Sequence, residues 1–168
     1  RLVGSEMCIR DRLYDMVLPP NSKQEKSFIR LVVTFVTLIK SSCKSIHEVI
    51  RQTKSVGDER NEFIITNIFQ PVYERYIEEL KKLNQIDFTD AILQATNICR
   101  SLHPVRYDYI IVDEFQDISV DRYNFLKVLR EGNPPAKLYC VGDDWQSIYR
   151  FSGSDMALFN QFLSLIHI

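Results

Sequence analysis

Apolar residues recur along the chain at two different spacings, and the change separates a helical first half from a mixed second half. Over residues 23–40 and 59–84 the apolar side chains return every three to four positions, which predicts two amphipathic helices. Pro71 is expected to interrupt the second helix, because proline has no backbone N–H. The first half is therefore predicted to be mainly α-helical.

Polar residues mark where two further helices begin. Ser45 and Glu48 have the spacing of a capping box, which predicts a short helix over residues 45–52. The sequence Asp-Phe-Thr-Asp at residues 87–90 predicts the N-terminal cap of a helix that runs to about residue 101.

The second half contains short, continuous apolar runs in place of the helical spacing. Residues 109–112 and 137–141 are expected to be strands buried on both faces, with residues 120–130 forming a helix between them. A strand, a helix and a strand so close in sequence form a βαβ unit, whose strands are parallel. We therefore predict an α/β fold, with a further helix that begins at Ser154 or Asp155.

Both ends of the chain share a coding property that unrelated protein ends should not have. Residues 7–11 can be encoded by ATG TGT ATA AGA GAC, and residues 163–168 by CTG TCT CTT ATA CAC ATC. In a shifted frame the second string is the reverse complement of the first with its flanks, and it resembles a transposon-based sequencing adapter. We interpret residues 1–12 and 163–168 as non-native ends, and the rest as an internal piece of a longer reading frame.

Composition excludes several classes of protein. The 168 residues are 45% hydrophobic and 26% charged, which is typical of a globular domain and not of a disordered chain. No apolar run reaches the roughly 18 residues that span a bilayer, so no membrane association is expected. The formal net charge is −1, so any binding of a polyanion must come from local placement of lysine and arginine.

Cysteine and histidine give no sign of a metal site. Cys8 lies in the terminal segment, and the other cysteines have no C-x-x-C partner, which argues against a disulfide framework or a zinc ribbon. We expect buried or half-buried thiols in a reducing cytoplasm at Cys43, Cys99 and Cys140. His47 and His103 lack metal-ligand spacing and are expected at the surface or at a helix cap.

Two acidic residues directly follow the first predicted strand. The sequence over residues 110–117 is Ile-Ile-Val-Asp-Glu-Phe-Gln-Asp, so the strand places Asp113 and Glu114 at its carboxyl end, where open α/β sheets bind ligands. Asp113 is suited to hold Mg²⁺ on nucleotide phosphates, and Glu114 to orient and deprotonate water. Taken without other evidence, two acidic residues after a strand are also consistent with an ordinary acidic loop that has no catalytic role.

A second polar segment follows the neighbouring strand. Residues 142–153 read Gly-Asp-Asp-Trp-Gln-Ser-Ile-Tyr-Arg-Phe-Ser-Gly. The Gln146 amide can both donate and accept a hydrogen bond, so it can respond to a phosphate or a water that changes on hydrolysis. Tyr149, Arg150 and Phe151 suit stacking on exposed bases together with a cationic contact, although aromatic residues also pack in cores.

Together the two segments resemble motifs II and III of the UvrD/Rep group of superfamily 1 DNA helicases, nearest to its helicase IV branch. Residues 113–117 match motif II, residues 142–153 match motif III, and residues 87–90 resemble a short segment that members carry upstream. The resemblance implies part of a RecA-like P-loop ATPase domain over residues 86–162. It also implies that a helical insert subdomain, similar to subdomain 1B, precedes it over residues 13–85.

The resemblance implies a role for each matched residue of the nucleotide site. Asp113 is the Mg²⁺ ligand and Glu114 the catalytic base of ATP hydrolysis, while Gln146 senses the γ-phosphate. Gln116 and Asp117 belong to the same cofactor-binding site and link it to motif III.

The resemblance also implies a DNA contact. Tyr149, Arg150 and Phe151 touch single-stranded DNA. Ser152 departs from the family pattern, because many relatives have arginine there, so that contact is absent or is made by Arg150.

The implied parent protein is a monomeric 3′–5′ helicase that uses ATP and Mg²⁺ to move on single-stranded DNA and to unwind duplex DNA. The chain contains no G-x-x-x-x-G-K-[ST] loop, so it is predicted to be inactive alone. Three alternatives stay open: a helicase–nuclease fusion, an RNA-polymerase-associated relative of the same motor, and a non-catalytic binding module with a degenerate motor fold.

Overall fold

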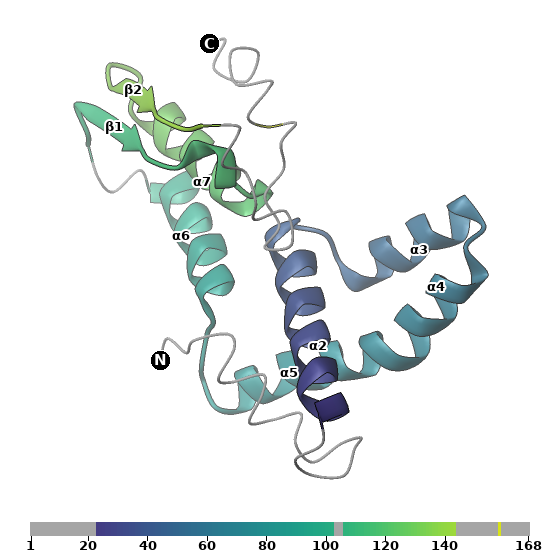
Figure 1. The fold of residues 1–168 in the computed structure, drawn as a ribbon. Helices are drawn as coiled ribbons and strands as arrows, with labels where there is room; N and C mark the ends of the chain where they lie inside the picture. Colours follow the sequence, from purple (N-terminus) through teal and green to yellow (C-terminus); the bar gives the residue numbers. More distant parts are fainter. Residues whose placement is uncertain (1–22, 103–105, 144–157, 159–168) are drawn as a thin grey trace. The chain divides into compact units, whose positions relative to one another are not determined.

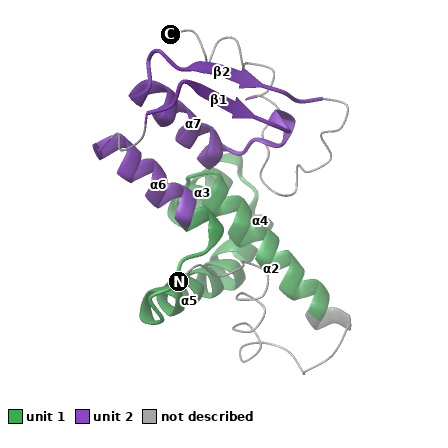
Figure 2. Ribbon diagram, turned by 90° about the vertical axis from the view of Figure 1, so that its left-hand side faces the viewer, with its two compact units in different colours: residues 1–90 green, residues 91–168 purple. Residues whose placement is uncertain are grey.

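A computed structural model describes residues 23–102, 106–143 and 158, with side chains described from residue 26 onward (Figure 1). The chain divides into two compact units, residues 1–90 and 91–168, which Figure 2 draws in different colours. The boundary falls inside one helix, α6 (Phe88–Leu102), and each unit is considered by itself.

The described part of unit 1 is helical, as its apolar spacing predicts. Its elements are α2 (Lys23–Ser41), α3 (Ile46–Val56), α4 (Glu59–Ile64), the π-helical segment η1 (Ile65–Phe69) and α5 (Gln70–Lys82). The helix predicted over residues 59–84 is thus interrupted, and the π-helical segment lies just before Pro71. Pro71 occupies the first turn of α5, so its missing N–H falls at the junction of α5 with the π-helical segment.

The predicted capping box is confirmed at the start of α3. The Ser45 hydroxyl oxygen accepts a hydrogen bond from the Glu48 N–H (3.2 Å), and the Glu48 carboxylate accepts one from the Ser45 N–H (2.7 Å). The helix runs to Val56, further than residue 52, because it ends at Gly57, which adopts the left-handed conformation with φ 75°.

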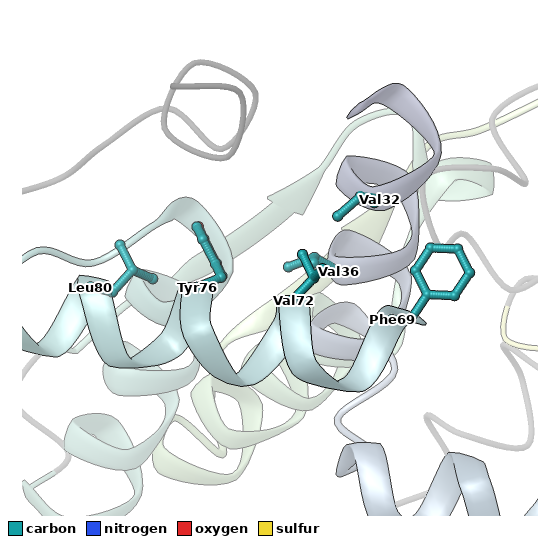
Figure 3. Packing of buried hydrophobic residues seen from close by; sticks show 6 residues of the cluster. All are labelled: Val32, Val36, Phe69, Val72, Tyr76 and Leu80. Atoms are coloured by element: carbon teal, nitrogen blue, oxygen red, sulfur yellow. The ribbon is translucent and has the colours of Figure 1, made fainter. Parts of the chain in front are cut away.

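The core of unit 1 lies between α2 and the η1–α5 segment (Figure 3). Val32 and Val36, one helical turn apart on α2, are almost fully buried. Their partners recur at helical spacing along the second segment: Phe69, Val72, Tyr76 and Leu80. The ring of Phe35 stacks on that of Phe69, with centroids 4.2 Å apart. The helical periodicity in the sequence therefore corresponds to one continuous apolar contact.

Unit 2 contains the predicted βαβ unit. Strand β1 (Tyr109–Val112) is followed by a 3₁₀ turn η2 (Phe115–Asp117), helix α7 (Val120–Gly132) and strand β2 (Lys137–Cys140). The two strands are parallel, with Tyr109 opposite Lys137 and Val112 opposite Cys140. The parallel pair confirms the α/β character of this half of the chain.

The expectation that both strands are buried on both faces is wrong. Ile110 and Leu138 point to the face that packs with Leu126 of α7. On the opposite face, Ile111 is 72% exposed and Tyr139 is 52% exposed. Alternate residues of a strand point to opposite faces, and within the described part of the chain only the face toward α7 is covered. An apolar run does not reveal whether its second face has a partner.

None of the described cysteines forms a disulfide, and one differs from expectation. Cys99 and Cys140 are half-buried, but Cys43 is exposed. Cys43 follows the last turn of α2 in the left-handed conformation, with φ 56°, so it has left the packed helix. His47 is exposed as predicted, and His103 lies outside the described residues.

Among the described helices, none combines the length and apolar character that crossing a membrane requires. The further helix expected from residue 154 or 155 lies outside the described residues, apart from Leu158, which is helical.

Candidate functional site

The site lies at the carboxyl edge of the two parallel strands, where hydrogen bonding continues beyond the strands. The Val141 N–H donates to the Val112 carbonyl (2.9 Å), and the Phe115 N–H donates to the Val141 carbonyl (2.9 Å). The loop after β1 and the segment after β2 are therefore joined through their backbones. Phe115 is buried in the cluster that includes Ile110 and Leu126, which anchors the loop to the core of unit 2.

Asp113 and Glu114 are both exposed at this edge. The Asp113 carboxylate accepts a hydrogen bond from the Glu114 N–H (2.9 Å). Glu114 adopts the left-handed conformation, with φ 52° and ψ 43°, which costs an L-residue about 1–2 kcal/mol. Backbone strain of this kind is concentrated at functional sites, which motivates a functional hypothesis for Glu114.

Gln116 is 1% exposed, and both ends of its amide are engaged by protein atoms. Its Nε2 donates to the Glu114 Oε2 (2.5 Å), and its Oε1 accepts from the Asp143 N–H (2.9 Å). The structure thus places Gln116 between the two predicted motifs, linked to the start of the second.

Gly142 packs so closely on this amide that no other residue fits without a shift. A Cβ at position 142 would lie 2.6 Å from the Gln116 Oε1 and 3.0 Å from the Gln116 backbone nitrogen. The close approach was not predictable from the sequence, because Gln116 is distant in sequence from Gly142. A glycine directly after a strand is the only signal that points to it.

Asp117 closes the 3₁₀ turn and has an unusual carboxylate. Its N–H donates to the Glu114 carbonyl (2.9 Å). Its Oδ1 is buried and has no hydrogen-bond partner among the described residues. Buried acceptors are nearly always paired in folded proteins, so this oxygen is available to a donor that the described residues do not supply.

The other predicted site residues, Gln146, Tyr149, Arg150 and Phe151, lie outside the described residues. What the structure brings together is the set Asp113, Glu114, Gln116 and Asp117, beside the first residues of the second motif.

These residues fit a Mg²⁺ ion that is held mainly by a nucleotide. Among the described residues no cluster of three His, Cys, Asp or Glu side chains could form a protein cage for a metal. Mg²⁺ bound to nucleotides typically has one or two carboxylate ligands, with phosphates and waters completing its octahedron. Asp113, exposed at the strand edge, meets that requirement.

Curated proteins with similar sequences are helicases by name. The chain is 43% identical over 98 residues to DNA helicase IV of Escherichia coli, covering 56% of this chain and 14% of that protein. It is 37% identical over 94 residues to the putative ATP-dependent DNA helicase YjcD of Bacillus subtilis, covering 50% of this chain and 12% of that protein. It is 28% identical over 136 residues to the ATP-dependent DNA helicase UvrD1 of Mycobacterium tuberculosis, covering 74% of this chain and 17% of that protein. The chain therefore spans less than one fifth of the length of each.

A family profile covers nearly all of the chain. The profile of the UvrD/REP helicase N-terminal domain matches residues 9–167. The match includes residues 9–12 and 163–167 of the terminal segments interpreted above as non-native, so that interpretation stays a prediction. Since the match extends far beyond half of the sequence, the chain belongs to the UvrD/REP helicase family, in the N-terminal domain of that family.

Proposed function

We propose that the chain is part of the first RecA-like motor domain of an ATP-dependent DNA helicase. The observation that carries the proposal is the position of Asp113 and Glu114, two exposed carboxylates at the carboxyl edge of a parallel strand pair. The relative UvrD1 is named an ATP-dependent DNA helicase, which supports ATP as the nucleotide.

The two carboxylates have different roles in this proposal. Asp113 would hold Mg²⁺, and the ion would supply positive charge beside the nucleotide phosphates. Glu114 orients the attacking water and accepts its proton. Gln116 and Asp117 complete the nucleotide site, and Gln146, which follows Asp143 closely in sequence, senses the γ-phosphate.

The segment after Gln146 provides the DNA contact. Tyr149 and Phe151 stack on bases of single-stranded DNA, and Arg150 adds a positive charge beside them. In the full-length protein, a monomer, ATP hydrolysis then drives 3′–5′ movement on one strand and unwinding of duplex DNA. The 168-residue chain has no G-x-x-x-x-G-K-[ST] loop to cradle phosphates, so we propose that it neither hydrolyses ATP nor unwinds DNA by itself.

The test is the substitution Glu114→Gln in the full-length protein that carries this segment. The amide keeps the size of the side chain and removes its basicity, so ATP hydrolysis should fall by about 10²–10⁴-fold while ATP binding persists. Turnover is measured by phosphate release, and binding by a fluorescent ATP analogue.

The matched control is Glu131→Gln. Glu131 is an exposed carboxylate at the end of α7, in a 4.0 Å pair with Lys127, and it lies outside the proposed site. This variant should hydrolyse ATP normally. Near-normal turnover in Glu114→Gln would refute the base role of Glu114, and with it the proposed use of this edge of the sheet.

A further inference from the structure

The Gln116 side chain contacts a proposed catalytic residue and a second loop at the same time. Its Nε2 lies 2.5 Å from the Glu114 Oε2, and its Oε1 lies 2.9 Å from the Asp143 nitrogen. The Gln116 side chain is almost completely buried, so water has little access to its amide, whereas the Glu114 carboxylate that it contacts is exposed. A buried amide with both ends bonded holds its partners in one arrangement.

The chemistry of the two partners determines which side chain can do this. The Glu114 carboxylate needs a donor, and the Asp143 N–H needs an acceptor. Glutamine provides both on one planar group. Glutamate at position 116 has only acceptors when ionised, and it would bring a second carboxylate against Glu114. Leucine has a similar size but makes neither bond.

Gly142 belongs to the same arrangement, because a side chain there would collide with the amide. A Cβ at this position would lie 2.6 Å from the Gln116 Oε1, and 3.0 and 3.1 Å from the backbone nitrogens of Gln116 and Phe115. Backbone atoms cannot rotate away as a flexible side chain does. Alanine at position 142 would therefore displace the amide or separate the two loops.

We propose that Gln116 is a positioning residue that orients the Glu114 carboxylate and joins it to the segment after β2, and that Gly142 is required for this contact. The inference rests on the proposed base role of Glu114. Gln116 then acts on the rate of hydrolysis through Glu114.

The test compares Gln116→Glu, Gln116→Leu and Gly142→Ala in the full-length protein, with Gln94→Glu as control, since Gln94 is exposed on α6. A positioning role predicts that kcat for ATP falls by about tenfold or more in all three, while KM changes by less than about threefold. The control should keep both constants.

A double substitution separates positioning from a purely structural role. If Gln116 acts through the Glu114 carboxylate, Gln116→Leu should cause little further loss of kcat in a Glu114→Gln background, because the group that it orients is already gone. A purely structural role lowers kcat by the same factor in both backgrounds, and that result would overturn the proposal.

A measurement on the unsubstituted protein remains informative even if the variants do not fold. Hydrogen exchange of the Asp143 amide should be slowed by about tenfold or more relative to an unprotected amide, because its N–H is bonded to a buried oxygen. Unprotected exchange would refute the contact. If Glu114→Gln retains turnover, the proposed function fails. If Glu114→Gln loses ATP hydrolysis but folded Gln116 variants keep a normal kcat, only the positioning role is refuted.

Discussion

Single residues in unit 2 show how strongly the site depends on local geometry. Glu114 is held in a backbone conformation that L-residues avoid, and Gly142 has a neighbour closer than any Cβ would tolerate. Both features lie within the two motifs. Sites that carry strain of this kind are typically retained for function, which is why the substitutions proposed above concentrate there.

Cys140, at the end of β2, should be an unreactive thiol. Burial raises its pKa from 9.0 to about 11, so the thiolate, the reactive form, is about 100-fold less abundant near neutral pH. Alkylation by iodoacetamide, followed peptide by peptide in a mass spectrometer, should be much slower at Cys140 than at the exposed Cys43. The rate at Cys140 should rise only as the pH approaches its raised pKa. The two residues should react alike in urea, and equal rates in the native protein would contradict the assignment.

At the scale of the element, the two ends of α3 are determined by residues of the helix and its immediate neighbours. The helix begins at a capping box and ends at a left-handed glycine, so its length is determined by residues 45, 48 and 57. The continuous helical stretch after Asp58 behaves differently. Its π-helical segment at Ile65–Phe69 adds a residue to a turn just before Pro71 and turns Phe69 toward the core.

Ser45→Ala should lower the free energy of unfolding of unit 1 by about 1 kcal/mol near neutral pH, because it removes the N-cap acceptor of α3. The hydrogen bonds from the Ser45 N–H and then from its hydroxyl lower the pKa of Glu48 below its usual 4.5. A lowered pKa means that the stability gained from these two bonds to the Glu48 carboxylate is present in full above the ordinary pKa and is lost as the pH falls through the lowered one. Ser45→Ala removes the hydroxyl bond of this pair together with the N-cap acceptor.

Urea unfolding followed by circular dichroism should therefore show a smaller effect of Ser45→Ala at acidic pH than near pH 7. Ser55→Ala is the matched control, since the Ser55 hydroxyl donates only to the Gln52 carbonyl at the other end of the same helix. An equal loss of stability in the two variants at neutral pH would argue against the capping box as the source.

At the scale of the whole molecule, each unit has its own core, and unit 1 also contains a buried polar network that joins distant parts of the chain. The Lys40 ammonium lies 2.6 Å from the Asp87 Oδ2 and 2.6 Å from the Asp90 Oδ1. Tyr76 of α5 donates its hydroxyl proton to the same Asp87 oxygen (2.9 Å). The network therefore connects the end of α2, the middle of α5 and the predicted N-terminal cap of α6, where the Asp90 N–H donates to the Asp87 Oδ1.

Lys40→Met should destabilise unit 1 by about 3–5 kcal/mol, because it leaves buried carboxylate charge without its counter-ion. Lys54→Met is the matched control. Its ammonium pairs with Glu62 at 3.1 Å in a largely exposed position, where such pairs contribute about 0–1 kcal/mol. The free energies of unfolding of the two variants are measured by urea unfolding and compared. Similar losses of stability, or a small loss for Lys40→Met, would show that the buried network does not stabilise the unit.

The sequence by itself determined the features that depend on neighbours along the chain. The helices of unit 1, the capping box at Ser45, the Asp87–Asp90 cap and the parallel strand pair were predictable. Their signals either repeat within three or four residues or form a short, continuous apolar run. Asp113 and Glu114 were predictable as exposed candidates for the same reason, since they directly follow an apolar strand.

Only the tertiary structure decided which distant residues meet. Lys40 lies 47 positions from Asp87, and Gln116 lies 27 positions from Asp143, so no local pattern indicates either contact. The exposed face at Ile111 likewise depends on what covers the sheet, which an apolar run does not encode. The physical reason is that local preference selects helix, strand or turn, whereas burial and pairing depend on which surfaces come together when the chain packs.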